Sequence, residues 1–355
     1  MDPLSHLLTG ACLARAGFNR KTSLATATMT LAAEFPDMDI VAYLGGPVFG
    51  FAHHRGFTHT LLGTLFDAAV VTGCVYLLYR LYRRWRPHIA GTVEPHWGLL
   101  YFFALIAALS HLLLDFTNSY GVRLFAPFNW RWYSWDIVNI IEPIMLGALI
   151  IGLVMPRLFA LISEEIGERK RNVPRGRGGA IFALTLIVAL WGVRDFQHRR
   201  AVAALGSLTY ESKEPLRVSA FPYSLTPFLW YGVVETDHHF EQVVVDSLKG
   251  EVDPQGRSRV RYKPEETDAT LAAKRSYLGR VYLDWARYPV TEVEQTTDPN
   301  RAYVVRFLDL RYDYPERQTA SLRCAVELDR NLNVVAQLWG RRSQAVIVEQ
   351  RTPGQ

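Results

Sequence analysis

The chain has 355 residues, of which 49% are hydrophobic and 21% charged, and its formal net charge is +5. This composition excludes a disordered chain, and only three cysteines exclude a disulfide-stabilised scaffold. The mean hydropathy is close to zero, but it averages two unlike parts. Four nearly uncharged runs lie within the first 200 residues, and an ordinary polar composition follows from about 205. The sequence therefore predicts a membrane part followed by a soluble part.

The first 35 residues predict two short apolar helices, at 4–16 and 22–35. Each is shorter than the roughly 20 residues that a helix needs to cross a bilayer. We therefore expect a tilted or half-depth hairpin. An acid, Asp2, comes first and no basic segment precedes the first helix, so we do not expect a cleaved signal peptide.

Four longer apolar runs predict membrane-spanning helices. They lie at 60–79, 97–116, 137–155 and 178–193. The alternative is a large buried core of a soluble helical protein. Four such runs so close together are hard to bury without lipid, so we favour the membrane.

From about residue 205 the hydrophobic pattern changes to an alternation with period two, which is typical of strands. The predicted strands lie at 216–221, 228–235, 240–248, 257–262, 301–312, 320–329 and 332–339. A helix is expected at 265–286. The predicted fold class is thus mixed, with a polytopic α-helical membrane domain at 1–200 and a soluble α+β domain with an antiparallel sheet at 205–355. The soluble domain has no catalytic motif, so its expected roles are to cover the site, bind substrate or contact a partner.

Imidazole and carboxylate side chains collect at one end of the predicted helices, and the opposite ends carry Arg and Lys. Following the helices up and down brings all of these groups to one membrane face. Ionisable groups within membrane helices are costly and mark candidate functional sites. The group comprises His6, Asp37, Asp39, His53, His54, His59, His111, Asp115, Asp136 and Glu142.

These residue types suit a divalent metal, with zinc as the first expectation, because imidazole and carboxylate occur without cysteine. His111 and Asp115 are four residues apart and share one helix face. Pro36 breaks a helix and lets Asp37 and Asp39 turn toward a common centre. The set exceeds one tetrahedral shell, so two ions with bridging carboxylates are expected. A polar network without metal is the alternative.

Four sequence blocks together resemble a bacterial inner-membrane metal-dependent hydrolase family over residues 1–195. They are Met1 to Gly10, Pro36-Asp37-Met38-Asp39, His54-Arg55-Gly56-Phe57-Thr58-His59 and Ser110-His111-Leu112-Leu113-Leu114-Asp115. That family is in turn similar to zinc-dependent phospholipase C and single-strand nucleases. The resemblance implies metal ligands at His6, Asp37, His59, His111 and Asp115. The later ligands of those enzymes have no match here, so a third metal is not expected.

These observations predict a membrane-bound metal-dependent hydrolase that uses a metal-activated water on a phosphodiester or lipid-linked substrate. Asp39 or Asp136 is expected to act as general base, and Arg55 or Arg123 to hold an anionic oxygen of the substrate. His54 is a further candidate ligand, and the choice between it and the preceding histidine stays open.

The alternative function is a non-catalytic, metal-stabilised membrane scaffold or sensor whose soluble domain binds a partner. An ion transporter fits less well, because the polar groups gather at one face. The expected partners are membrane lipid and a lipid-phase substrate. Nucleic acid is not expected, because the basic charge comes mostly from arginines that flank the membrane runs.

The distribution of Arg and Lys predicts the orientation in the bacterial inner membrane. Basic side chains are frequent at 80–96 and 157–177, so these loops should face the cytoplasm. An aromatic belt near 130–135 and residues 205–355 should then face outside. Reporter fusions at residue 90 and at the C-terminus test this prediction, and a cytoplasmic C-terminus would contradict it.

Overall fold

The computed structural model describes residues 1–85, 94–165, 176–314 and 321–340. The chain divides into two compact units. The helical unit comprises Met1–Ile40, His54–Phe196 and Pro222–Pro227, and the sheet unit comprises Val41–His53, Gln197–Phe221 and Phe228–Gln355. Much of the two predicted basic loops lies outside the described residues.

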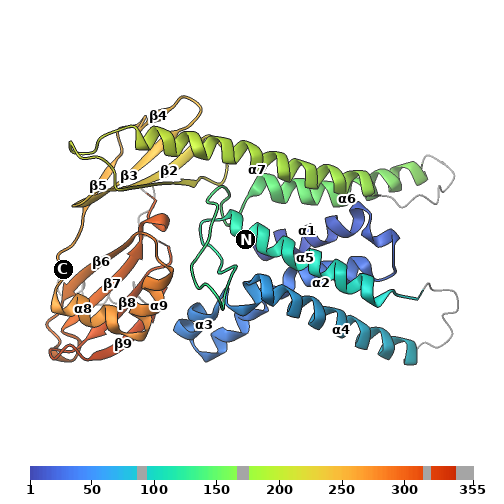
Figure 1. Cartoon of the computed structure of the whole chain (residues 1–355), viewed down its shortest axis with the longest axis horizontal. Coiled ribbons are helices and arrows are strands. Elements are labelled where there is room, and N and C mark those ends of the chain that lie inside the picture. The colour runs from blue at the N-terminus through green and yellow to red at the C-terminus, as the bar shows by residue number, and fades with distance from the viewer. Residues whose placement is uncertain (86–93, 166–175, 315–320, 341–355) are drawn as a thin grey trace. The chain divides into compact units, whose positions relative to one another are not determined.

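Six helices make up most of the helical unit. They are α1 (Pro3–Ala16), α2 (Ala25–Glu34), α4 (Leu61–Trp85), α5 (Trp97–Thr117), α6 (Pro143–Glu165) and the first two thirds of α7 (Arg177–Gly206). In Figure 1 the ends of α4 and α6 lie at the same end of this unit as the starts of α5 and α7. The helices therefore run alternately up and down, as the sequence predicts.

Three of these helices, α4, α5 and α7, are long and apolar enough to cross a membrane, and α6 has a shorter apolar part, Pro143–Pro156. The predicted run at 137–155 is wrong at its start, because α6 begins only at Pro143. The preceding residues are not helical, and the amides of the buried Ile137 and Val138 donate to the Thr117 carbonyl at 3.0 and 3.1 Å. Apolar composition alone could not distinguish this irregular segment from a helix.

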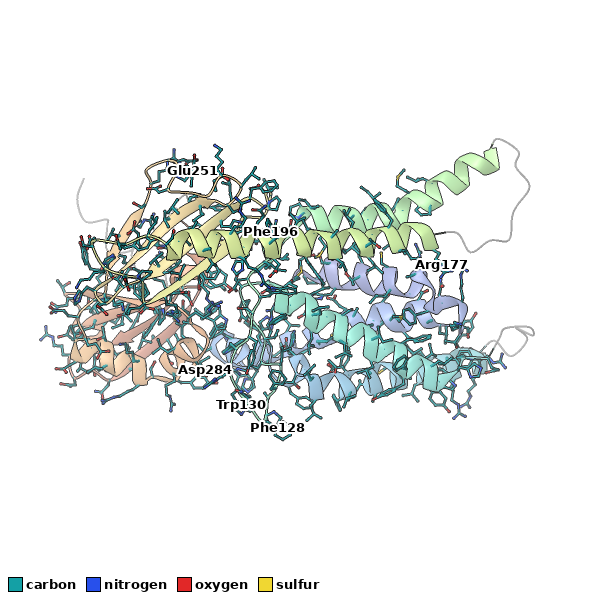
Figure 2. All side chains as sticks on the ribbon, turned by 45° about the horizontal axis from the view of Figure 1, so that its top comes forward. Phe128, Trp130, Arg177, Phe196, Glu251 and Asp284 are labelled. Atoms are coloured by element: carbon teal, nitrogen blue, oxygen red, sulfur yellow. The ribbon has the colours of Figure 1, made fainter. Side chains whose placement is uncertain are left out.

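The aromatic segment between α5 and α6 ends in an exposed tip. Figure 2 shows the Phe128 and Trp130 side chains projecting from it. They are 89% and 57% exposed. Exposed aromatic rings of this kind suit the interface between membrane and water, and the aromatic belt on the outer face stays a prediction.

The contact between α1 and α2 positions the first part of the candidate site. The Asp2 carboxylate caps α1 by accepting from the Ser5 amide at 2.9 Å. At Gly10 the two helices touch so closely that an added Cβ would lie 2.5 Å from the Met29 carbonyl oxygen and 2.7 Å from the Ala33 Cβ. Only a residue without a side chain fits this position.

The sheet unit holds two antiparallel sheets. The five-stranded sheet comprises β1 (Arg217–Pro222), β2 (Leu229–Glu235), β3 (His239–Asp246), β4 (Glu251–Val252) and β5 (Arg259–Tyr262). The four-stranded sheet runs in the order β6 (Pro289–Gln295), β7 (Tyr303–Asp309), β8 (Cys324–Leu328) and β9 (Val334–Trp339). The predicted antiparallel domain is confirmed, although its strands form two sheets and the sequence analysis did not include β4 or β6.

The helix predicted at 265–286 is two helices, α8 (Asp268–Arg275) and α9 (Tyr277–Trp285). Ser276 separates them, because its extended backbone ends α8 and its hydroxyl accepts from the Gly279 amide at 3.0 Å. A serine in the middle of a helical pattern is a typical N-cap. The short helix α3 (Pro47–His53) belongs to this unit, where Phe51 packs on Trp285 and Trp339.

The contact at Gly10 generates a stability prediction. Gly10→Val should separate α1 from α2 and lower the free energy of unfolding by roughly 1–3 kcal/mol, because the core cannot absorb the added methyl groups. Gly147→Val is the control, since an added Cβ at Gly147 has no atom within 4 Å. Thermal unfolding in detergent checks this, and equal melting temperatures for the two variants would contradict it.

Candidate metal centre

Four side chains of the helical unit converge on one point, and we call them the Asp/His cluster: Asp37, His59, His111 and Asp115. One ligand atom from each lies within 4.8 Å of the others. Asp37 comes from the 3₁₀ helix Phe35–Gly45, His59 from the 3₁₀ helix Phe57–His59, and the other two from successive turns of α5. The break at Pro36 thus does what the sequence predicts, since it turns Asp37 toward the centre.

The distances within the Asp/His cluster match a tetrahedral ion. His59 Nε2 lies 3.1 Å from His111 Nε2, 3.2 Å from Asp37 Oδ1 and 3.5 Å from Asp115 Oδ2. His111 Nε2 lies 3.6 Å from the same two carboxylate oxygens. Ligands of a tetrahedral zinc at roughly 2.0–2.1 Å are separated by roughly 3.3–3.4 Å. The geometry therefore suits one ion with four ligand atoms.

The hydrogen bonds of the two histidines fix which ring nitrogen faces the centre. His111 Nδ1 donates to the Ala33 carbonyl at 2.7 Å, so its Nε2 carries a lone pair. His59 Nδ1 lies 3.2 Å from Asp39 Oδ2, an acceptor that places the proton on Nδ1. Two imidazole lone pairs therefore meet two carboxylate oxygens. Four acceptors at one buried point repel one another unless a cation, or a proton shared over the 3.2 Å between His59 Nε2 and Asp37 Oδ1, lies among them.

Asp39 supports the Asp/His cluster from outside. Its Oδ2 also accepts from the Arg55 amide at 2.7 Å, and its Oδ1 accepts from His54 Nδ1 at 3.0 Å. Burial alone raises the pKa of Asp39, but the hydrogen bonds from His54 and His59 outweigh it and hold that pKa below its usual range. Both oxygens of this ionised carboxylate are engaged by donors, so the geometry favours a positioning role over the predicted general base.

Arg55 contacts the Asp/His cluster through Asp115. Its backbone has φ 55°, the left-handed conformation, and its side chain is buried. Nη2 donates to Asp115 Oδ1 at 2.7 Å, and Nη1 donates to the Gly121 carbonyl at 2.9 Å. The guanidinium also lies over the Tyr120 ring, 4.6 Å from its centroid. It therefore faces Asp115, and the substrate-holding role predicted from the sequence stays a prediction.

Asp115 divides its two oxygens between these surroundings and the centre. Oδ1 accepts from Arg55, from Asn118 Nδ2 at 3.3 Å and from the Met1 amino group. Oδ2 is buried and has no hydrogen-bond partner among the described residues. The donors on Oδ1 hold the carboxylate so that Oδ2 points into the Asp/His cluster.

His6 adjoins the Asp/His cluster without being one of its four members. Its buried ring stacks on His111 with 3.7 Å between centroids, and its Nε2 lies 3.4 Å from Asp115 Oδ1. Neither ring nitrogen has a hydrogen-bond partner within the part of the chain that the structure describes. Buried polar atoms without partners are rare and call for a missing ligand or ion. His6 is therefore a candidate for an additional ligand.

The other predicted site residues lie outside the Asp/His cluster. His54 pairs with Asp39, and His53 is exposed with its Nδ1 2.9 Å from the Phe49 carbonyl. Asp136 is buried in the segment between α5 and α6, and the Arg123 guanidinium packs on the Trp132 ring at 4.3 Å. Among the described residues one group of four qualifies as a metal site, so the two-ion arrangement stays a prediction.

Two polar groups of the helical unit are not in the site predicted from the sequence: Asn118, which carried no signal, and Asp67, which was expected to pair with a threonine or a neighbouring helix. Asn118 links the end of α5 to the loop by accepting from the Tyr120 amide at 2.8 Å, and its amide group donates to Asp115. Asp67 lies in the middle of α4, fully buried, and neither of its carboxylate oxygens has a partner among the described residues. An acid within an apolar run was a visible signal for Asp67, whereas nothing in the sequence distinguished Asn118.

Comparisons with known proteins agree with the membrane character of this unit. The family model "YdjM inner membrane protein" matches residues 1–201, a range that contains the whole Asp/His cluster. The chain is 26% identical over 326 residues to "Uncharacterized protein YfhP" of Bacillus subtilis (strain 168). The aligned region covers 88% of this chain and 87% of that protein. No solved structure matches the chain.

The geometry predicts which histidines hold metal. His111→Ala removes an imidazole lone pair from the centre and should abolish stoichiometric binding of zinc to the purified protein. His53→Ala is the matched control, because it removes an exposed imidazole that is not a member of the Asp/His cluster. Elemental analysis after dialysis against zinc checks both variants, and equal zinc content would contradict the assignment.

Proposed function

The chain belongs to the YdjM inner membrane protein family, and we propose that it is a membrane-bound metal-dependent hydrolase. One observation carries the proposal. Two imidazole nitrogens and two carboxylate oxygens meet at a buried point of the helical unit, an arrangement that a cation would stabilise. Zinc is the metal proposed, because the ligand set combines imidazole with carboxylate and the spacing is tetrahedral.

A divalent ion held there would lower the pKa of a water bound to it and would polarise a substrate oxygen. The protein's own part is to fix the ligands. Asp39 holds the His59 ring, and Arg55 holds Asp115. Supporting hydrogen bonds of this kind orient metal ligands and raise the affinity for the ion.

The Asp/His cluster is open on one side. The Asp37 side chain is 21% exposed, whereas His59, His111 and Asp115 are fully buried. Substrate and water would therefore approach past Asp37.

The alternative function is a metal-stabilised scaffold or sensor. The count of four protein ligands favours it, because structural zinc sites have four protein ligands, whereas catalytic sites have three and keep one position open.

An apolar groove beside Asp37 supports a lipid-phase substrate. It has a volume of about 210 Å³ and lies between α2 and α4. Phe35 and Met38, which flank Pro36-Asp37, line it together with Leu31 and Leu78. A hydrocarbon chain in this groove would contact Phe35 and Met38, on both sides of Asp37 in the sequence. A phosphodiester headgroup is proposed on the resemblance to phospholipase C.

Activity is expected on at least one member of a panel of lipid and small-molecule phosphodiesters when the protein is loaded with zinc or manganese. His111→Ala should lose metal and turnover together, because it deletes a ligand. If the wild-type protein binds metal but hydrolyses nothing, the scaffold alternative is preferred. If it binds no metal, the hypothesis that the Asp/His cluster is a metal site is wrong.

Arg55→Ala separates two roles of the arginine. If Arg55 positions Asp115, its loss should weaken metal binding by about 10–100-fold, and excess metal should restore turnover. If Arg55 instead holds the substrate, metal binding should stay unchanged and excess metal should not help. We expect restoration, as measured by turnover across a zinc titration.

A further inference from the structure

A second cavity lies at the end of the helical unit opposite the Asp/His cluster. It has a volume of about 800 Å³ and is bounded by the end of α1, the start of α5 and the start of α7. Leu99 on its wall and His111 in the Asp/His cluster are both on α5, and twelve residues of helix separate them by roughly 18 Å. The two sites are therefore distinct.

The polar part of this cavity is basic. Its charged lining residues are Arg20, Lys21 and Arg177, and no acidic side chain is among the described residues that line it. Arg177 Nε donates to the Ala16 carbonyl at 2.9 Å, which ties the start of α7 to the end of α1. Figure 2 shows Arg177 at the start of α7. All three basic side chains are exposed, so they are accessible to an anionic group.

The remaining wall is apolar, and part of it belongs to a candidate membrane span, α5. Leu99 and Phe102 lie in the first turns of α5 and are 40% and 54% exposed. Phe18 packs edge-on against Phe103, with 4.7 Å between the ring centroids. The cavity thus combines cationic and apolar side chains where two candidate spans, α5 and α7, begin.

We propose that this cavity binds an anionic phospholipid, with its phosphate on Arg20, Lys21 and Arg177 and an acyl chain along Leu99 and Phe102. The ends of membrane spans lie at the depth of lipid phosphates, and basic pockets between such helices suit anionic headgroups. Guanidinium groups match phosphate in shape and charge. The site does not depend on the proposed hydrolase, because it shares no residue with the Asp/His cluster.

The test compares lipids with identical acyl chains on the purified full-length protein in a non-denaturing detergent. Native mass spectrometry measures binding of phosphatidylglycerol against phosphatidylcholine. Wild type should prefer phosphatidylglycerol, and Arg20→Gln/Lys21→Gln should bind it roughly tenfold or more weakly. This variant leaves the Arg177 hydrogen bond to α1 intact. Arg80→Gln/Arg83→Gln, which removes two positive charges from α4 outside the cavity lining, should keep the wild-type preference.

Three outcomes overturn the proposal: no preference in the wild-type protein, equal losses in the cavity variant and the α4 variant, or displacement of bound phosphatidylglycerol by inorganic phosphate. The last would mean that the site takes free phosphate and that its apolar wall is not used. If the double variant aggregates on size exclusion, Lys21→Gln and Phe102→Ala replace it. Each should then weaken phosphatidylglycerol binding severalfold, and unchanged binding in both contradicts the assignment.

Discussion

The crowding of four hydrogen-bond acceptors in a buried position is the constraint on which the helical unit depends. Carboxylates and imidazole lone pairs withdrawn from water repel one another, and the low dielectric of the interior strengthens that repulsion. A cation among these groups would supply the missing attraction. Separate elements place the four groups at this point. The break at Pro36 places Asp37, the 3₁₀ helix Phe57–His59 places His59, and α5 places both His111 and Asp115.

Three of the four side chains of the Asp/His cluster are also held by a group that does not face the centre. The Ala33 carbonyl fixes His111, Asp39 fixes His59, and Arg55 fixes Asp115. These three supports come from different segments, so no short stretch of the chain can form the site alone. Such support reduces the entropy lost when an ion binds, which is how a site gains affinity without additional ligands.

Several features were predictable because they depend on local pattern. The long apolar runs gave three of the spans, and the spacing of His111 and Asp115 placed both on one face of α5. What failed depended on tertiary contacts. The irregular segment before Pro143 pairs with the end of α5, which composition cannot show. The strand β6 was overlooked because it begins with a proline and alternates with glutamates, so it resembles a polar loop. The direction of the Arg55 side chain follows from its left-handed backbone, for which the sequence carries no signal.

The backbone of Arg55 bears on how this position tolerates change. A left-handed φ suits glycine or asparagine and costs a long side chain roughly 1 kcal/mol or more. Glycine at position 55 would therefore relax the turn while it removed the guanidinium from Asp115. The backbone strain at position 55 would then decrease, while the Asp115 carboxylate would lose the hydrogen bond that orients it. At this residue the sequence that folds most easily and the sequence that best arranges the centre are different sequences.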